Sequence, residues 1–103
     1  MSDEKKHPPV PVQVRIELDP ETAQGTYVNM AMVNHNETEF TLDFIYVQPQ
    51  EPKGKVRARI ISSPKHAKRL LMALQDSVTG YERKFGEIDI GPNFMMPTGK
   101  IFN

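Results

Sequence analysis

The fold is decided by residues 55–85, which read KVRARIISSPKHAKRLLMALQDSVTGYERKF. From Lys55 to Ile60 basic and apolar residues alternate strictly, and a period of two is typical of a half-buried β-strand. After Pro64 the apolar residues recur at spacings of four and three, which places them on one side of a helix. These residues are Ala67, Leu71, Leu74, Val78, Tyr81 and Phe85. Ser63 and Pro64 mark the switch, because serine caps a helix and proline suits its first position, and Gly86 predicts the helix end.

Three further apolar residues, Leu70, Met72 and Ala73, widen the apolar surface of this predicted helix. One helix on one small sheet cannot bury all of it within a single chain. A surplus apolar flank is what a homo-oligomer uses, and symmetric dimers are the commonest solution. We therefore expect a homo-oligomer, with a dimer favoured, and these three residues are candidate contacts.

Three strands are predicted upstream of this stretch. They are Val12–Leu18, Thr26–Val33 and Phe40–Val47, and each is bounded by turn residues such as glycine, proline or asparagine. The last of them is the strongest strand in the sequence. The predicted inner faces are, in chain order, Val12, Val14, Ile16 and Leu18; Val28, Met30 and Met32; and Phe40, Leu42, Phe44 and Tyr46.

These elements predict an α+β fold. It consists of a four-stranded antiparallel β-meander, in the strand order 1-2-3-4, with one long C-terminal helix packed on one face. The helix is expected to run from Pro64 to about residue 84, and its contact with the sheet is the main source of stability. The predicted register of the last hairpin pairs Leu42 with Ile60, Phe44 with Ala58, and Asp43 with Arg59 or Arg57.

The chain divides into three parts. Residues 1–11 are polar, charged and proline-rich, and are predicted to form a disordered arm. Residues 12–90 form a single α+β domain, in which Glu87–Ile90 is expected to dock as a short strand. Residues 91–103 form an apolar, irregular tail, because two glycines and two prolines interrupt it. This tail either packs on its own domain or binds another protein, and its candidate oligomer contacts are Phe94, Met95 and Met96.

Length and composition set the class of protein. A chain of 103 residues is one small domain with a modest core. It contains no cysteine, which excludes disulfides and thiolate catalysis and suits a reducing compartment. The first residues lack the apolar core of a secretory signal, and no segment is apolar enough to cross a bilayer. We expect a cytoplasmic protein with no membrane contact.

The 13 basic and 13 acidic residues cancel, but they are segregated along the chain. Between Arg15 and Lys53 there are 7 acids and no base, whereas between Glu51 and Asp76 there are 7 bases and no acid. Either the two halves pair within the fold, which antiparallel strands favour, or they present faces of opposite sign to partners.

The basic half supplies the candidate binding residues. His66 lies in the first turn of the predicted helix, where free amides attract anions, although a partly exposed helix residue without a binding role is the favoured interpretation. The candidate contacts for an anion or a nucleic acid are Lys55, Arg57, Arg59, Lys65, His66, Lys68 and Arg69. Nucleic-acid binding is the less favoured alternative, because no aromatic residue lies among these bases for stacking and the isoelectric point is near neutral.

No catalytic site, metal site or cofactor is predicted. The sequence has no nucleophile elbow, phosphate-binding glycine loop or paired-histidine motif. Capping explains Ser62 and Ser63, and a cross-strand arginine explains Asp43 without a catalytic role. These features favour a protein that is not an enzyme.

Four runs carry a family resemblance: EFTLDF at 39–44, KVRARII at 55–61, SPKHAKRLL at 63–71 and YERKFG at 81–86. Together they resemble a family of short bacterial proteins catalogued as domain of unknown function 3467, over roughly residues 12–90. The resemblance implies a compact soluble domain of a prokaryotic cytoplasm and implies no activity. The sequence thus predicts a non-enzymatic, oligomeric protein-interaction module; the alternative is a nucleic-acid-binding protein that uses the stripe from Lys55 to Arg69.

Overall fold

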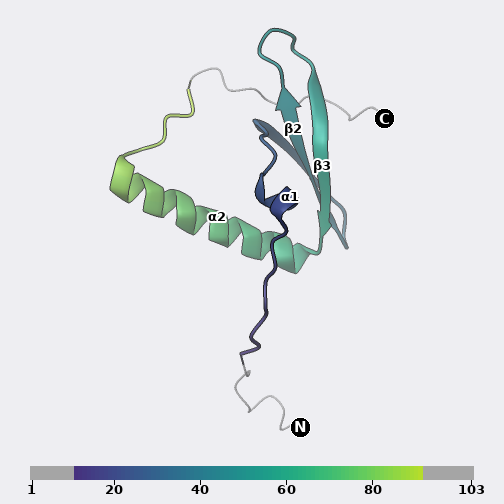
Figure 1. The fold of residues 1–103 in the computed structure, drawn as a ribbon, viewed down its shortest axis with the longest axis vertical. Helices are drawn as coiled ribbons and strands as arrows, with labels where there is room; N and C mark the ends of the chain where they lie inside the picture. Colours follow the sequence, from purple (N-terminus) through teal and green to yellow (C-terminus); the bar gives the residue numbers. More distant parts are fainter. Residues whose placement is uncertain (1–10, 92–103) are drawn as a thin grey trace.

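The computed structural model describes residues 11–91 and confirms the α+β class. Its elements are α1 (Pro20–Ala23), β1 (Met30–His35), β2 (Phe40–Val47), β3 (Gly54–Ser62) and α2 (Pro64–Phe85). Figure 1 shows an upright, twisted sheet from whose lower end α2 projects to one side. The predicted arm, residues 1–11, and the predicted tail, residues 91–103, lie outside the described part of the chain except for Pro11 and Gly91.

The sheet is an antiparallel meander in the order β1-β2-β3. Its predicted register is confirmed, because Leu42 pairs with Ile60 and Phe44 pairs with Ala58. The β1–β2 turn is held by Asn36, whose Oδ1 accepts hydrogen bonds of 2.8 Å from the backbone amides of Thr38 and Glu39. Asparagine supplies such local acceptors at turns, as the sequence indicated.

The sheet has three strands and not the four predicted. Residues 11–18 are exposed along their whole length, and Figure 1 shows them running away from the sheet as a drawn-out segment. The predicted second strand also begins later, at Met30. The short helix α1 follows this segment directly and turns the chain between it and β1. Asp19 caps α1 by accepting a 3.0 Å hydrogen bond from the amide of Thr22, so residues 11–18 do not continue alongside the sheet.

Asn29 then fixes the start of β1 against the end of β2. Its side-chain Oδ1 accepts a 2.8 Å hydrogen bond from the amide of Val47, and its Nδ2 donates a 3.0 Å hydrogen bond to the carbonyl of the same residue. A side-chain amide can imitate a neighbouring strand in this way because it carries one acceptor and two donors. The pairing of β1 with β2 is therefore extended to Asn29, one residue before β1 begins.

Helix α2 has the predicted ends. Ser63 is the N-cap and its hydroxyl accepts a 3.2 Å hydrogen bond from the amide of His66, while Pro64 occupies the first turn. Gly86 ends the helix with a φ of 99°, which is a conformation that glycine adopts without strain. The helix is unbroken through Leu71 and is about 33 Å long at 1.5 Å per residue.

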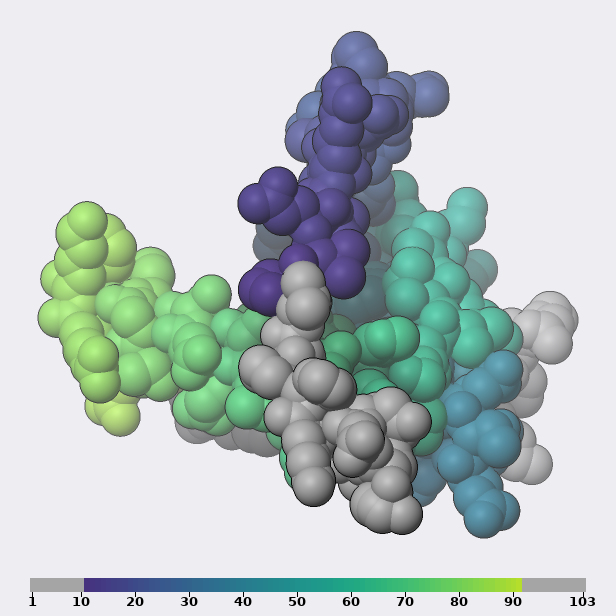
Figure 2. Space-filling model, turned by 90° about the horizontal axis from the view of Figure 1, so that it is seen from below, coloured from purple at the N-terminus to yellow at the C-terminus, as the bar shows by residue number. Residues whose placement is uncertain are grey.

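The predicted packing of this helix on its own sheet is wrong. The substantial contacts between elements are those of β1 with β2 and of β2 with β3. A single residue, Ser63, separates β3 from α2, and folding a helix back over a sheet takes a longer connection. As a result α2 stands clear of the sheet in both views of the molecule (Figures 1 and 2).

The small core lies on the face of β2 opposite to the one predicted. Among the described residues, Ile45, Val47 and Asp43 are the buried ones, whereas Phe44 and its neighbours on the predicted inner face are only half-buried. Gly54 is required beside this core, because a Cβ there would come within 2.8 Å of the Ile45 Cγ2 atom. The predicted inner face is uncovered because the helix does not reach it.

The buried Asp43 forms an ion pair with the exposed Arg59 next to these aliphatic residues. The Asp43 side chain is 0% exposed, and its two oxygens accept hydrogen bonds from Arg59, 2.7 Å from Nε and 3.1 Å from the terminal nitrogen. This confirms the predicted cross-strand pairing. The carboxylate raises the pKa of the Arg59 guanidinium, first through its hydrogen bonds and then through its charge.

Replacing Asp43 with asparagine should lower the free energy of unfolding by about 1–3 kcal/mol, because one amide cannot accept both arginine hydrogen bonds and its own donors stay buried. Urea titration followed by circular dichroism at a fixed protein concentration measures this change. The control is Glu39→Gln, an exposed acid just before the same strand, which should change stability by less than about 0.5 kcal/mol. An Asp43→Asn protein as stable as the wild type would contradict the assignment.

Candidate interaction surface

One face of the sheet is apolar and uncovered. Residues paired across an antiparallel ladder share a face, so the face of Leu42 and Phe44 also carries their partners on both sides. Those partners are Val33, Ala31, Ile60 and Ala58, and all four are exposed. A continuous apolar surface therefore spans all three strands.

The second apolar surface is the stripe on α2, formed by Ala67, Leu71, Leu74, Val78, Tyr81 and Phe85. Its large members are exposed, with Leu74 at 59%. Tyr81 and Phe85 contact each other at a ring-centroid distance of 4.9 Å, so the far end of the stripe is an aromatic pair. The stripe therefore has the apolar pattern of a helix that packs on a core, but its large side chains are exposed.

The third apolar feature is the alternating segment Val12–Leu18, whose Ile16 is 86% exposed. Across the described residues, 16 large apolar side chains are exposed and two are buried in the core. Stable monomers of this size bury most of their large apolar side chains and rarely expose contiguous apolar patches. The described residues therefore leave more large apolar side chains exposed than a stable monomer of this size usually does.

The predicted oligomer contacts fall on different parts of this surface. Leu70 flanks the α2 stripe, whereas at 100° per residue Met72 and Ala73 lie on the far side of the helix, with Met72 about 140° from the centre of the stripe. Met72 is 60% exposed. The other three candidates, Phe94, Met95 and Met96, lie outside the described residues.

The predicted basic stripe is divided between two faces of the sheet. A β-bulge makes Arg57 an extra residue in β3, so that Lys55 pairs with Tyr46 while Arg59 pairs with Asp43. Positions 43 and 46 of β2 are an odd number of residues apart and face opposite ways. Lys55 and Arg59 therefore do not share a face, which corrects the prediction that they do. The remaining candidates, Lys65, His66, Lys68 and Arg69, are exposed on the first turns of α2.

His66 is engaged by the helix cap. Its Nδ1 lies 3.0 Å from the Ser63 hydroxyl, the same hydroxyl that accepts the hydrogen bond from the His66 amide. Ser63 is thus used in the capping role that the sequence indicated. This arrangement supports the simpler interpretation of His66 as an exposed helix residue.

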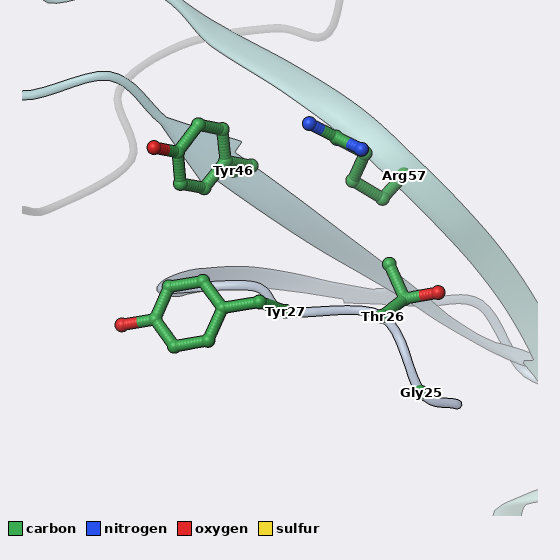
Figure 3. Close-up of a pocket in the computed structure, with 5 residues that line it drawn as sticks. All are labelled: Gly25, Thr26, Tyr27, Tyr46 and Arg57. Carbon is green, nitrogen blue, oxygen red and sulfur yellow. The ribbon is translucent and has the colours of Figure 1, made fainter. Parts of the chain in front are cut away.

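A shallow hollow of about 470 Å³ lies on the apolar side of the sheet, lined by Gly25, Thr26, Tyr27, Tyr46 and Arg57. Figure 3 shows the two tyrosine rings one below the other, with the arginine beside the upper ring. The rings meet edge to face at 6.2 Å, and the Arg57 guanidinium carbon lies 5.3 Å from the Tyr46 ring centre. No carboxylate or imidazole lines this hollow, so its walls offer no acid–base pair.

The sequence pattern does not predict this hollow. It predicts Tyr46 only as an inner-face residue of its strand, and the stacking of Arg57 depends on the bulge, for which the alternating sequence gives no signal. Within residues 11–91 no group of three metal-ligating side chains comes together. No helix among these residues is long and apolar enough to span a bilayer.

The fold and surface define a small α+β protein with a three-stranded sheet, a projecting C-terminal helix and a large uncovered apolar surface. Its sequence matches the model of one family over residues 1–90. The chain belongs to the family described as protein of unknown function (DUF3467). Searches of curated proteins and of solved structures found no match.

Replacing Ser63 with alanine should lower stability by about 1 kcal/mol, because the amide of His66 loses its acceptor at the start of α2. The matched control is Ser77→Ala, an exposed serine in the middle of the same helix, which should raise stability by a few tenths of a kcal/mol through the better helix propensity of alanine. Thermal unfolding followed at 222 nm compares the two. Equal effects at both positions would exclude the capping role.

Proposed function

We propose that this protein is a non-enzymatic interaction module that works as a homodimer. In this dimer the α2 stripe of each copy packs on the apolar sheet face of the other. The observation that carries the proposal is that one chain has both surfaces of a sheet-and-helix core, and the single-residue junction at Ser63 keeps them apart. A second copy supplies each surface with the partner that it lacks within its own chain.

The energetics favour this association. Burying a large apolar side chain contributes about 1.5–3 kcal/mol. Two helices contribute eight such side chains, which at full burial amount to about 12–24 kcal/mol. Association costs on the order of 4–15 kcal/mol in lost translational and rotational freedom. The stripe residues counted are Leu71, Leu74, Tyr81 and Phe85 of each copy.

Geometry favours a reciprocal arrangement. A two-fold dimer uses the same surface of both copies, so the helix of each chain lies on the sheet of the other and both apolar faces are covered at once. A helix about 33 Å long is long enough to cross three strands spaced about 4.8 Å apart. Lys65 and Arg69 lie on the side of α2 away from the stripe and stay available to acidic partner surfaces.

The nucleic-acid alternative has less support. The bulge at Arg57 divides the basic residues, Arg59 is paired with Asp43, and Arg57 is stacked on Tyr46. Binding to a fluorescein-labelled DNA or RNA at about 150 mM salt should therefore be no tighter than the non-specific range of about 10⁻⁴–10⁻⁶ M. A Kd below about 10⁻⁷ M, with a steep salt dependence, would favour the alternative.

Replacing Leu74 with aspartate should weaken the dimer by at least about 100-fold in Kd, because a charge would be buried in the proposed contact. The matched control is Met72→Asp, which changes an equally exposed apolar residue on the far side of the same helix and should leave the Kd unchanged. Sedimentation equilibrium over a concentration series gives both values.

Circular dichroism of each variant shows whether α2 is still formed, so that dissociation is not confused with unfolding. A wild-type chain that stays monomeric at micromolar concentration would overturn the proposal. Dissociation by Met72→Asp, with Leu74→Asp unchanged, would place the contact on the other face of the helix.

A further inference from the structure

We propose that residues 12–18 form a strand in a second copy of the chain, where they pair with the open edge of β1. This inference rests on the proposed self-association and states which further segment the copies exchange. The three-stranded sheet of each copy would thereby gain its fourth strand from the other copy.

The donor segment has the sequence of a strand, and no strand within residues 11–91 pairs with it. Val12, Val14, Ile16 and Leu18 alternate with polar residues, which is the pattern of a strand with one buried face. All of these apolar side chains are exposed, and no hydrogen bond between described residues reaches the backbone of residues 11–18. An exposed alternating segment of this kind pairs readily with an open sheet edge.

The linker directs this segment away from its own sheet. Tyr27 packs on Tyr46 and Asn29 is held by both backbone groups of Val47, so the linker is anchored on the apolar side of the sheet. Before these anchors, Gly25 turns the chain with a φ of 79° and Asp19 fixes the start of α1. Residues 11–18 therefore run away from the sheet as an extended segment (Figure 1).

Within residues 11–91 both edge strands of the sheet have one side unpaired, and they differ in how that side is protected. The edge strand β3 carries the charges of Lys55 and Arg57 and a bulge in its ladder with β2, and lysines and bulges are devices that keep edge strands from pairing. The outer edge of β1 reads Met-Ala-Met-Val-Asn-His and has neither an acid, a lysine or arginine, a proline nor a bulge. We therefore assign the donated strand to β1.

The side chains of the donor fit that position. Seven residues pair with the six of β1, and one face of the donor is wholly apolar. This apolar face is placed on the same side of the sheet as Ala31 and Val33. In that orientation Val14 and Ile16 extend the apolar surface that is proposed to receive α2. Gln13, Arg15 and Glu17 then lie on the opposite face, beside the half-buried Met32 at the edge of the sheet.

Cysteine cross-linking tests this assignment cleanly, because the chain has no cysteine of its own. One chain carries Ile16→Cys, and the other carries Ala31→Cys or Val33→Cys, which covers the two registers that keep the apolar face together. The two chains are unfolded together, refolded as a mixture and oxidised. Residues opposite each other in adjacent antiparallel strands have Cα atoms about 4.5–5.5 Å apart, which suits a disulfide.

One of these mixtures should give a disulfide-linked dimer that contains up to about half of the chains. Only dimers of the two different variants can form the link, and random pairing of equal amounts makes about half of the dimers mixed. The control mixture pairs Ile16→Cys with Ile60→Cys on β3, about 14 Å away across three strand spacings, and should give little product. Mass spectrometry identifies the linked peptides. Sedimentation of each unoxidised mixture reports whether the dimer forms at all.

Three results would overturn the assignment, and they differ in what else they affect. A strong link from residue 16 to residue 60 would place the donor on β3. A sedimenting dimer that links in neither mixture would exclude strand donation and leave the proposed dimer standing. A monomer in every mixture would overturn the proposed function and the donated strand together.

Discussion

The structure depends on the junction of β3 and α2, which is one residue long. Ser63 caps the helix while Ser62 still pairs with Phe40, so the strand passes into the helix without a loop. Pro64 restricts the backbone at the same point. The helix direction is therefore set by the strand that precedes it, and α2 points away from the sheet face for which its stripe is suited. The apolar stripe of α2 and the apolar face of the sheet therefore do not pack on each other within the described chain.

A sheet with one bare face needs other means to hold its strands together. Here they lie on the opposite face and at the strand ends: the Asp43–Arg59 pair joins β2 to β3, and Asn29 joins the start of β1 to the end of β2. These are directional polar contacts, and a charge-assisted pair is stronger than an ordinary hydrogen bond. They fix the register with only Ile45 and Val47 as a buried aliphatic core in the described residues. These contacts therefore hold the three strands in place without an element packed on the apolar face.

Sequence periodicity predicted the helix, its caps, the last two strands and the pairing of Leu42 with Ile60, because these follow from local patterns and from the ladder. It did not predict where α2 would pack. An apolar stripe indicates a surface that favours burial, but it does not identify the surface that would cover it. The same limit applies to Val12–Leu18. The division of the basic residues between two faces was missed for another reason: the bulge at Arg57 shifts the alternation by one residue, and nothing in Lys55–Ile60 marks it.

Family membership bears on the extent of the proposed assembly. The family match runs from residue 1 to residue 90 and so spans the donor segment, the sheet and the whole of α2. It ends before Phe94, Met95 and Met96, and the association proposed here requires none of them. All the surfaces that would meet in the dimer therefore belong to the matched region. On this reasoning a core completed between copies would be a feature of the DUF3467 fold as such, and folding of the sheet-and-helix core would depend on the concentration of the chain.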